Sequence, residues 1–227
     1  AGYDVSRLLA GSLGTLGLVV QVSLKVLPMP FCDATLRFAM PQAEAIDTLN
    51  RWGGQPLPIA ASAWINGTLW VRLCGADAAV RAAITKLGGE RVDDAEAATF
   101  WRDLREQSHT FFARAVQGNQ PLWRIALPPA TPPLALGGAS SDEQLVEWGG
   151  GQRWWIDAAE SSNCAPADAI RDAARKAGGH ATLFRNGDRA SDIFTPVTAP
   201  LMAVHKRLKD SFDPHGIFNP GRLYADF

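Results

Sequence analysis

Apolar and polar side chains alternate along one stretch near the start of the chain. Between Leu18 and Leu27 a leucine or valine stands at every even position, and polar residues fill most positions between them. A period of two residues is typical of a β-strand with one buried face, so this stretch predicts a strand. Pro28 and Pro30 end the pattern and favour an extended linker, which predicts a domain boundary at about residue 30.

Helix and strand patterns then follow one another in a definite order. Asn66-Gly67 stands between two apolar runs and predicts a tight β-hairpin. Asp77 is placed to cap a helix whose apolar residues recur three and four positions apart. The predicted elements are a strand at 34–40, a helix from Pro41 to Gly53, strands at 57–65 and 69–73, a helix that ends at Gly88-Gly89, and a strand at 90–92. This β-α-β-β-α-β order predicts the α+β class, with a ferredoxin-like antiparallel sheet and helices on one face.

The remaining patterns extend the same α+β domain. We expect a helix at 95–112, a strand at 122–127, a proline-rich surface loop at 128–141, a strand at 153–158, a helix at 167–177, a strand at 181–184 and a final helix at 200–212. The helix at 167–177, Gly178-Gly179 and the strand after them echo the earlier helix, Gly-Gly and strand unit. The predicted organisation is therefore 1–30, 31–212 and 213–227, with the middle part forming one domain.

Composition and charge exclude several classes of function. The 22 basic and 23 acidic residues give a net charge of −1 without long runs of either sign, so no surface for nucleic acid is expected. Cys32, Cys74 and Cys164 are far apart and form no disulfide framework or cluster motif, which fits a reducing cytoplasm. The longest apolar run is well below the ~20 residues of a membrane span. We find no signal peptide and, without an initiator methionine, expect the chain to begin in mid-protein.

Three glycines at three-residue spacing, Gly11, Gly14 and Gly17, stand directly before the first predicted strand. Glycine lets the backbone turn tightly and approach a ligand, which leaves N–H groups free to bind phosphate or ring atoms. A glycine-rich turn before a strand is also often only a turn, and the spacing does not decide between the two. The segment is not a Rossmann fingerprint, because a strand and not a helix follows it.

With its flanks, this turn resembles the end of the FAD-binding domain in flavoproteins of the vanillyl-alcohol-oxidase type. The resemblance rests on Gly2 to Val19 and on the C-terminal run from Phe212 to Leu223, which is similar to the closing motif of the same superfamily. Four segments between these anchors look more narrowly like the FAD-binding subunit family of bacterial glycolate oxidases: Leu69 to Leu73, Leu122 to Ile125, Trp148-Gly149-Gly150 and Gly178 to Thr182. The resemblance covers essentially the whole chain, which would be the C-terminal portion of such a subunit.

The resemblance implies FAD as the cofactor of the intact protein. Residues 1–30 would be the C-terminal end of the FAD-binding domain, 31–212 the cap or substrate domain, and 213–227 a segment that returns to the flavin. The cofactor-binding residues would be Gly11, Ser12, Gly14, Thr15 and Gly17, through their backbone, and Asn219, through its side chain. Relatives often carry Glu where this chain has Leu13, and the pyrophosphate loop of the family does not occur before Gly2. We therefore expect the isolated chain to be inactive and colourless.

The histidines offer one candidate acid or base. His109, His180, His205 and His215 show no metal-ligand spacing, so no metal site is expected, although members of the superfamily that oxidise 2-hydroxy acids carry histidine-rich metal motifs. His205 lies on the apolar stripe of its predicted helix and is expected to be partly buried. His180 follows a Gly-Gly pair and leads into a strand, which makes it the best candidate beside the flavin. The alternative for His180 is an ordinary residue at the start of a strand.

A small carboxylate substrate would need a positive anchor, for which arginine is best suited. Arg124, Arg153 and Arg185 are each on or beside a predicted strand, and the sequence does not choose among them. We take His180 and Arg185 as candidate catalytic residues and Arg124 and Arg153 as candidate substrate-binding residues. Each arginine is otherwise a surface residue whose aliphatic stem covers apolar area.

The resemblance predicts an oxidoreductase that converts glycolate to glyoxylate, with hydride passing from C2 of the substrate to flavin N5. It implies a second flavoprotein subunit and an iron–sulfur subunit as partners, the latter because this chain has no cysteine cluster. The alternatives are a non-catalytic electron-relay or assembly subunit, or a FAD-linked dehydrogenase for another small 2-hydroxy acid such as D-lactate. We expect a cytoplasmic location, with peripheral contact to the inner membrane through the complex as an alternative. A bare apolar face would favour homodimers of the isolated chain.

Overall fold

The computed structural model describes residues 4–134, 136, 143–157, 167–188, 193–225 and 227. The chain divides into two compact units, of which the larger is Pro28–Gly187 and the smaller combines Ala1–Leu27 with Asp188–Phe227. The first division lies close to the predicted boundary at residue 30. The second differs from the predicted division at 212, because the helix α7 (Ala199–Phe212) is bonded to the glycine turn of the smaller unit through Lys209.

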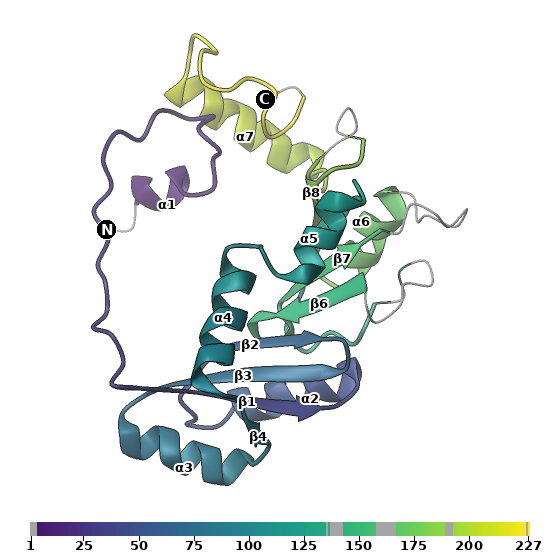
Figure 1. Ribbon diagram of the computed structural model, residues 1–227. Helices are drawn as coiled ribbons and strands as arrows, with labels where there is room; N and C mark the ends of the chain where they lie inside the picture. The colour runs from purple at the N-terminus through teal and green to yellow at the C-terminus, as the bar shows by residue number, and fades with distance from the viewer. Residues whose placement is uncertain (1–3, 135, 137–142, 158–166, 189–192, 226) are drawn as a thin grey trace. The chain divides into compact units, whose positions relative to one another are not determined.

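An eight-stranded antiparallel sheet forms the centre of the larger unit, in the order β4-β1-β3-β2-β6-β7-β5-β8 (Figure 1). Its strands are β1 (Cys32–Ala39), β2 (Ile59–Ile65), β3 (Thr68–Gly75), β4 (Glu90–Arg91), β5 (Leu122–Ala126), β6 (Gln144–Glu147), β7 (Gln152–Ile156) and β8 (His180–Arg185). The predicted hairpin is confirmed, since Asn66 and Gly67 both have positive φ, 47° and 75°, as its turn requires. The α+β class and the ferredoxin-like arrangement are also confirmed.

The sheet consists of two halves with the same strand order. In the first half, β4-β1-β3-β2 is the ferredoxin-like order. The second half has the same order when β5 is counted as its first strand and the sheet is read from the opposite edge, as β8-β5-β7-β6. The helices α3 (Asp77–Leu87) and α6 (Ala167–Lys176) occupy corresponding places, each before the last strand of its half. The halves join where Trp64 of β2 lies opposite Val146 of β6. This join pairs two strand edges that would otherwise be open.

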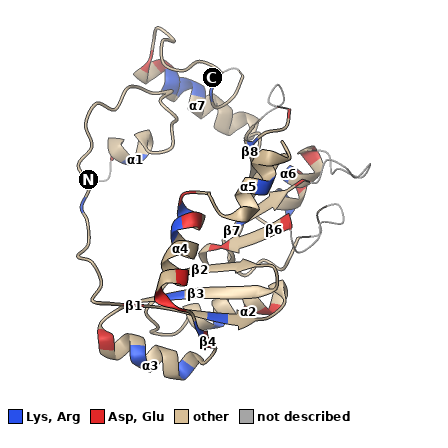
Figure 2. Cartoon of the chain, viewed as in Figure 1, with Lys and Arg blue, Asp and Glu red and all other residues tan. Residues whose placement is uncertain are grey.

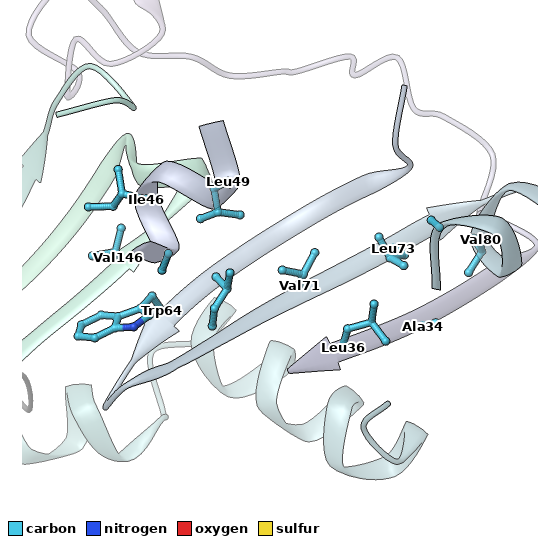
Figure 3. Packing of buried hydrophobic residues seen from close by; sticks show 12 residues of the cluster. Ala34, Leu36, Ile46, Leu49, Trp64, Val71, Leu73, Val80 and Val146 are labelled. Atoms are coloured by element: carbon cyan, nitrogen blue, oxygen red, sulfur yellow. The ribbon is translucent and has the colours of Figure 1, made fainter. Parts of the chain in front are cut away.

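One face of the first half is covered by α2 (Gln42–Gly53) and α3. Alternate residues of β3 are fully buried there, as the period of a strand requires. Figure 3 shows side chains of both helices packed with those of the strands: Ile46, Leu49 and Val80 from the helices, and Ala34, Leu36, Trp64, Val71, Leu73 and Val146 from the sheet. The cap position of α3 is Ala76 rather than the predicted Asp77, which lies in the first turn and pairs with Arg81 at 2.5 Å.

Two further helices cover part of the opposite face of the sheet. They are α4 (Asp94–Arg105) and α5 (Thr110–Gln117), and they replace the single helix predicted at 95–112. The helix breaks because Gln107 adopts a φ of 57°, and the Nδ1 atom of His109 then caps α5 by accepting from the N–H of Phe111 at 3.2 Å. Phe100 of α4 stacks on Trp70 of β3, with the ring centroids 4.0 Å apart. The second half of the sheet has its own core beneath α6.

The smaller unit contains α1 (Val5–Leu9), the glycine turn, α7 and the C-terminal segment. His205 of α7 is half-buried, with its ring centroid 6.0 Å from that of Phe227. The strand predicted at 18–27 is wrong: the segment is extended but pairs with no strand in the described part of the chain. Alternation specifies a strand only when a neighbour supplies backbone partners and an apolar surface to cover, and this segment has neither.

Candidate functional site

The glycine turn is built from residues that adopt left-handed backbone angles. Gly11 and Gly14 have φ of 84° and 74°, and Leu13 between them has a φ of 53°. Thr15 is fully buried, and both its N–H and its hydroxyl donate to the carbonyl oxygen of Ser12, at 3.0 and 2.7 Å. This internal hydrogen bonding makes the segment a defined turn rather than a loose connection.

The closing motif meets this turn directly. The Nδ2 atom of Asn219 donates to the carbonyl oxygen of Leu13 at 2.8 Å, across 206 positions of sequence. A Cβ atom at Gly14 would lie 2.8 Å from the same Nδ2 atom, so only glycine permits this approach. The two motifs that the sequence analysis took as anchors therefore form one site within the smaller unit.

A buried ion pair holds the two motifs together. The ammonium of Lys209 on α7 donates to Thr15 O at 2.6 Å, to Phe218 O at 2.7 Å and to Asp213 Oδ2 at 2.7 Å. The carboxylate of Asp213 also accepts from the N–H groups of Ile217 and Phe218, at 3.0 and 2.8 Å. The hydrogen bond from Lys209, with those two backbone donors, lowers the pKa of Asp213 to about 2. The carboxylate of Asp213 therefore stays ionised at any physiological pH.

Sequence reasoning missed this pair. The sequence predicts a helix at 200–212 that ends at Asp213-Pro214, and its pattern assigns no role to Lys209. The available signal was the spacing of Lys209 and Asp213, because an i,i+4 pair at a helix end, directly before a proline, can fold back on the next turn. Such spacing is also common on solvated helix faces, where an ion pair contributes little. Only the burial seen in the structure identifies this pair as a structural contact.

In the larger unit, one face of the second half of the sheet carries three of the predicted residues. Arg124 lies opposite Thr182, so it shares a face with His180 two positions earlier on β8. The guanidinium carbon of Arg124 lies 5.7 Å from the ring centroid of Phe184, and that of Arg185 lies 5.8 Å from the same centroid. Arg185 also donates to Gln107 Oε1 at 3.2 Å. The structure thus brings Arg124 and Arg185 together around one aromatic ring, with His180 exposed on the same strand as Arg185.

Arg153 is placed apart from these residues. It lies opposite Ile125 on the other face of the sheet, and it is only 4% exposed. The guanidinium donates to the carbonyl oxygens of Thr131, Pro132 at 2.7 Å and Gly150 at 3.2 Å. Burial lowers its pKa to about 10. Because all these donors are used on main-chain carbonyls, Arg153 fastens the loop after β5 instead of offering a charge to a substrate.

A cavity of about 750 Å³ lies on the face of the sheet that α4 partly covers. It exists because small side chains meet there, with Ala61 on β2 and Ala97 and Ala98 on α4. Glu147, which the sequence analysis did not single out, lines it and accepts through Oε2 from the indole N–H of Trp154 at 2.6 Å. Figure 2 shows charged residues of both signs on α4 beside this face. The cavity is therefore mixed in charge.

Trp148 stands at this cavity in a conformation that tryptophan rarely adopts. It has a φ of 54° and a side chain that is 73% exposed, and it opens the 3-10 helix Trp148–Gly150. The next residue, Gly149, is fixed by a hydrogen bond from its N–H to Ser62 Oγ at 2.9 Å. Strained backbone of this kind costs about 1–3 kcal/mol and persists only where the surrounding structure fixes it.

Burial raises the pKa of Glu147 above its ordinary value, and the hydrogen bonds from Trp154 and Gln152 offset part of this effect. Folded Glu147 therefore binds the proton more tightly than it does in the unfolded chain, so its contribution to stability is fully present below pH 4.5 and is lost as pH rises through the raised pKa. In Glu147→Gln this decline should be smaller, so the variant should gain stability relative to the parent between pH 4 and 7. Urea unfolding at several pH values measures this, with Glu44→Gln, an exposed position on α2, as the control. Parallel pH profiles for the parent and Glu147→Gln would contradict the expectation.

No group of three or more His, Cys, Asp or Glu side chains is arranged to hold a metal ion in the described part of the chain. No described helix is long and apolar enough to span a membrane.

The C-terminal part of the chain, residues 194–223, matches the family described as FAD linked oxidases, C-terminal domain. The chain is similar to members of the FAD-linked oxidase superfamily. It is 44% identical over 226 residues to the glycolate oxidase subunit GlcE of Escherichia coli (strain K12). That alignment covers 100% of this chain and 59% of the relative, so the chain spans about three fifths of the length of the relative it matches.

The geometry of the smaller unit fits the polar groups of FAD. The N–H groups of Leu13 and Gly14 have no hydrogen-bond partner among the described residues, and they follow each other in a turn of positive φ. Successive backbone N–H groups in such turns bind anionic oxygens. A shallow cavity of about 530 Å³ adjoins them, lined by Leu13, Asn219, Pro220, Gly221 and Arg222. Main-chain donors, an amide and an arginine are the groups that phosphate and flavin ring oxygens require.

Proposed function

We propose that the chain is part of a FAD-dependent glycolate oxidase subunit, which oxidises glycolate to glyoxylate. The observation that carries the proposal is the 2.8 Å hydrogen bond from Asn219 to Leu13 O, because it unites the glycine turn and the closing motif. The 44% identity to a protein named as a glycolate oxidase subunit supports glycolate as the substrate. The superfamily supports FAD as the cofactor.

The residues take separate roles in this proposal. The flavin, when bound, supplies a two-electron acceptor for the hydride from C2 of the 2-hydroxy acid. The backbone of Gly11, Ser12, Gly14, Thr15 and Gly17 binds the cofactor, with Asn219 fixing the turn. In the larger unit, Arg124 binds the substrate carboxylate, and His180 accepts the hydroxyl proton. Arg185, beside the same aromatic ring as Arg124, adds a second positive charge.

A second candidate function is a non-catalytic electron-relay or assembly subunit of the same complex. It is favoured by one observation: the described residues contain no cluster of potential metal ligands, whereas related oxidases of 2-hydroxy acids, as the resemblance implies, use such motifs. A FAD-linked dehydrogenase for another small 2-hydroxy acid, such as D-lactate, is the remaining alternative, because an arginine anchor does not distinguish short substrates from one another.

We propose a second flavoprotein subunit and an iron–sulfur subunit as partners, the latter to take electrons from the flavin. The proposed location is the cytoplasm, with peripheral contact to the inner membrane through the complex. For the 227-residue chain alone we propose no flavin and no activity, with homodimers as its expected assembly. Visible flavin absorbance in the purified chain would overturn the proposal that the chain alone binds no flavin.

The test uses the full-length subunit, assembled with its partner subunits. We expect Asn219→Ala to lower the flavin content, and His180→Ala and Arg124→Ala to keep flavin but lower glycolate turnover by about 10²-fold. Arg81→Ala, on an exposed turn of α3, is the control for an arginine substitution. A full-length subunit that contains no flavin would contradict the proposal that FAD is its cofactor. Full turnover in both His180→Ala and Arg124→Ala, with flavin retained, would favour the relay function.

A further inference from the structure

We propose that Lys209 and Asp213 are positioning residues for the cofactor, and that their buried ion pair sets the direction in which the glycine turn presents its N–H groups. The proposal rests on the function proposed above and extends it to two residues that do not reach the ligand themselves. Both side chains are buried: 9% of Lys209 and 2% of Asp213 is exposed.

Every donor of the Lys209 ammonium is used, and the acceptors come from both the glycine turn and the closing motif. Thr15 O comes from the glycine turn, Asp213 Oδ2 from the end of α7, and Phe218 O from the closing motif, directly before Asn219. An ammonium group has three donors, so this arrangement is complete. One side chain therefore fixes the distance between the turn and the residue that contacts it.

The held carbonyl groups determine where the free N–H groups point. In a trans peptide the C=O and the following N–H project in opposite directions. Ser12 O accepts from Thr15, Leu13 O from Asn219 and Thr15 O from Lys209. The N–H groups of Leu13, Gly14 and Leu16 are consequently turned away from those donors, and none has a hydrogen-bond partner among the described residues. Lys209 and Asn219 thus act on the same short stretch of backbone.

A purely stabilising role does not explain why ionised groups are used here. A buried ion pair adds little stability over apolar residues of similar size, because desolvation offsets the attraction. Asp213 nevertheless binds the N–H groups of Ile217 and Phe218 as well as Lys209, and so shapes the turn that leads to Asn219. Apolar replacements fill the space but cannot hold three carbonyl or carboxylate oxygens in fixed directions.

The expected result is a loss of cofactor affinity without unfolding of the larger unit. In the full-length subunit, Lys209→Met should raise the dissociation constant of FAD by at least about tenfold, measured by quenching of flavin fluorescence. Arg207→Met, at an exposed position on the same helix, is the matched control and should leave the constant unchanged. All eight tryptophans of the 227-residue chain lie in the larger unit. Unfolding of that chain, followed by tryptophan fluorescence, should therefore be the same in the parent and in Lys209→Met.

A double variant separates positioning from general damage. If Lys209 and Asn219 act through the same turn, Lys209→Met should weaken FAD binding little further in a protein that already carries Asn219→Ala. If the dissociation constant of FAD in the double variant rises by the product of the two single effects, the positioning role is overturned. Unchanged affinity in Lys209→Met would overturn it as well, and both results would leave the proposed function standing. Absence of FAD binding in the parent subunit would remove the proposed function, and the positioning role with it.

Discussion

Replacing Gly179 by alanine is expected to destabilise the larger unit by about 3 kcal/mol, at the upper end of what overpacking usually costs. Gly179 lies between α6 and β8 and packs against β5. An added Cβ would overlap the carbonyl oxygen of Ala126 and lie 3.0 Å from its carbonyl carbon and 2.8 Å from Leu127 Cδ2. A backbone carbonyl cannot rotate away as a side chain can, so relief requires the pairing of β5 with β8 to shift.

Gly53→Ala is the matched control, because no atom lies within 4 Å of a Cβ at this position near the end of α2. It should change the free energy of unfolding by less than about 0.5 kcal/mol or raise it, since alanine is the better helix former. Urea unfolding of the 227-residue chain, followed by tryptophan fluorescence, measures both variants. Equal midpoints for Gly179→Ala and the parent would show that the strand spacing is looser than the structure gives.

Phe112→Ala is expected to cost about 4 kcal/mol, within the range observed for removal of a buried phenylalanine. Phe112 is 1% exposed and packs its ring edge-on against Trp154 of β7, with the centroids 5.2 Å apart. The prediction tests whether α5 is part of the same cooperative core as the sheet. Were α5 a loosely attached helix, the loss would be small.

Val116→Ala on the same helix serves as the comparison, because Val116 is 51% exposed and removal of its methyl groups leaves no cavity. We expect it to change stability by less than about 0.5 kcal/mol. Urea unfolding followed by circular dichroism reports on both variants. A cost in Val116→Ala comparable with that in Phe112→Ala would contradict packing against the sheet as the cause of the loss, because Val116 is exposed and alanine is the better helix former.

Local patterns predicted most of the elements of the larger unit because their cause is local. The turn at Asn66-Gly67 requires positive φ, and the apolar periods of α2, α3 and α6 match the faces that they bury. The β6 strand escaped prediction because four residues are too few to establish a period. The break between α4 and α5 depends on a left-handed Gln107, which composition does not signal.

The candidate site likewise has parts that the sequence predicted and parts that it did not. The glycine turn and Asn219 were found from their motifs, and the structure brings them into contact. Lys209 and Glu147 were missed, because the character of each depends on burial, and Lys209 also depends on a partner, Thr15, that is distant in sequence. The choice among arginines also required the fold: strand register places Arg124 and Arg153 on opposite faces of the sheet, which spacing along the chain cannot show across separate strands.

The extended segment at 18–27 has a consequence for how the chain behaves in concentrated solution. Leu18, Val20, Val22, Leu24 and Val26 are 65% to 88% exposed, and Lys25 is the only charged residue within the segment. A stretch of high β-propensity, with unpaired backbone and almost no charge to repel a copy of itself, readily forms intermolecular sheets. Loss of material during purification of the isolated chain would therefore begin with this segment, even while the large sheet remains fully folded.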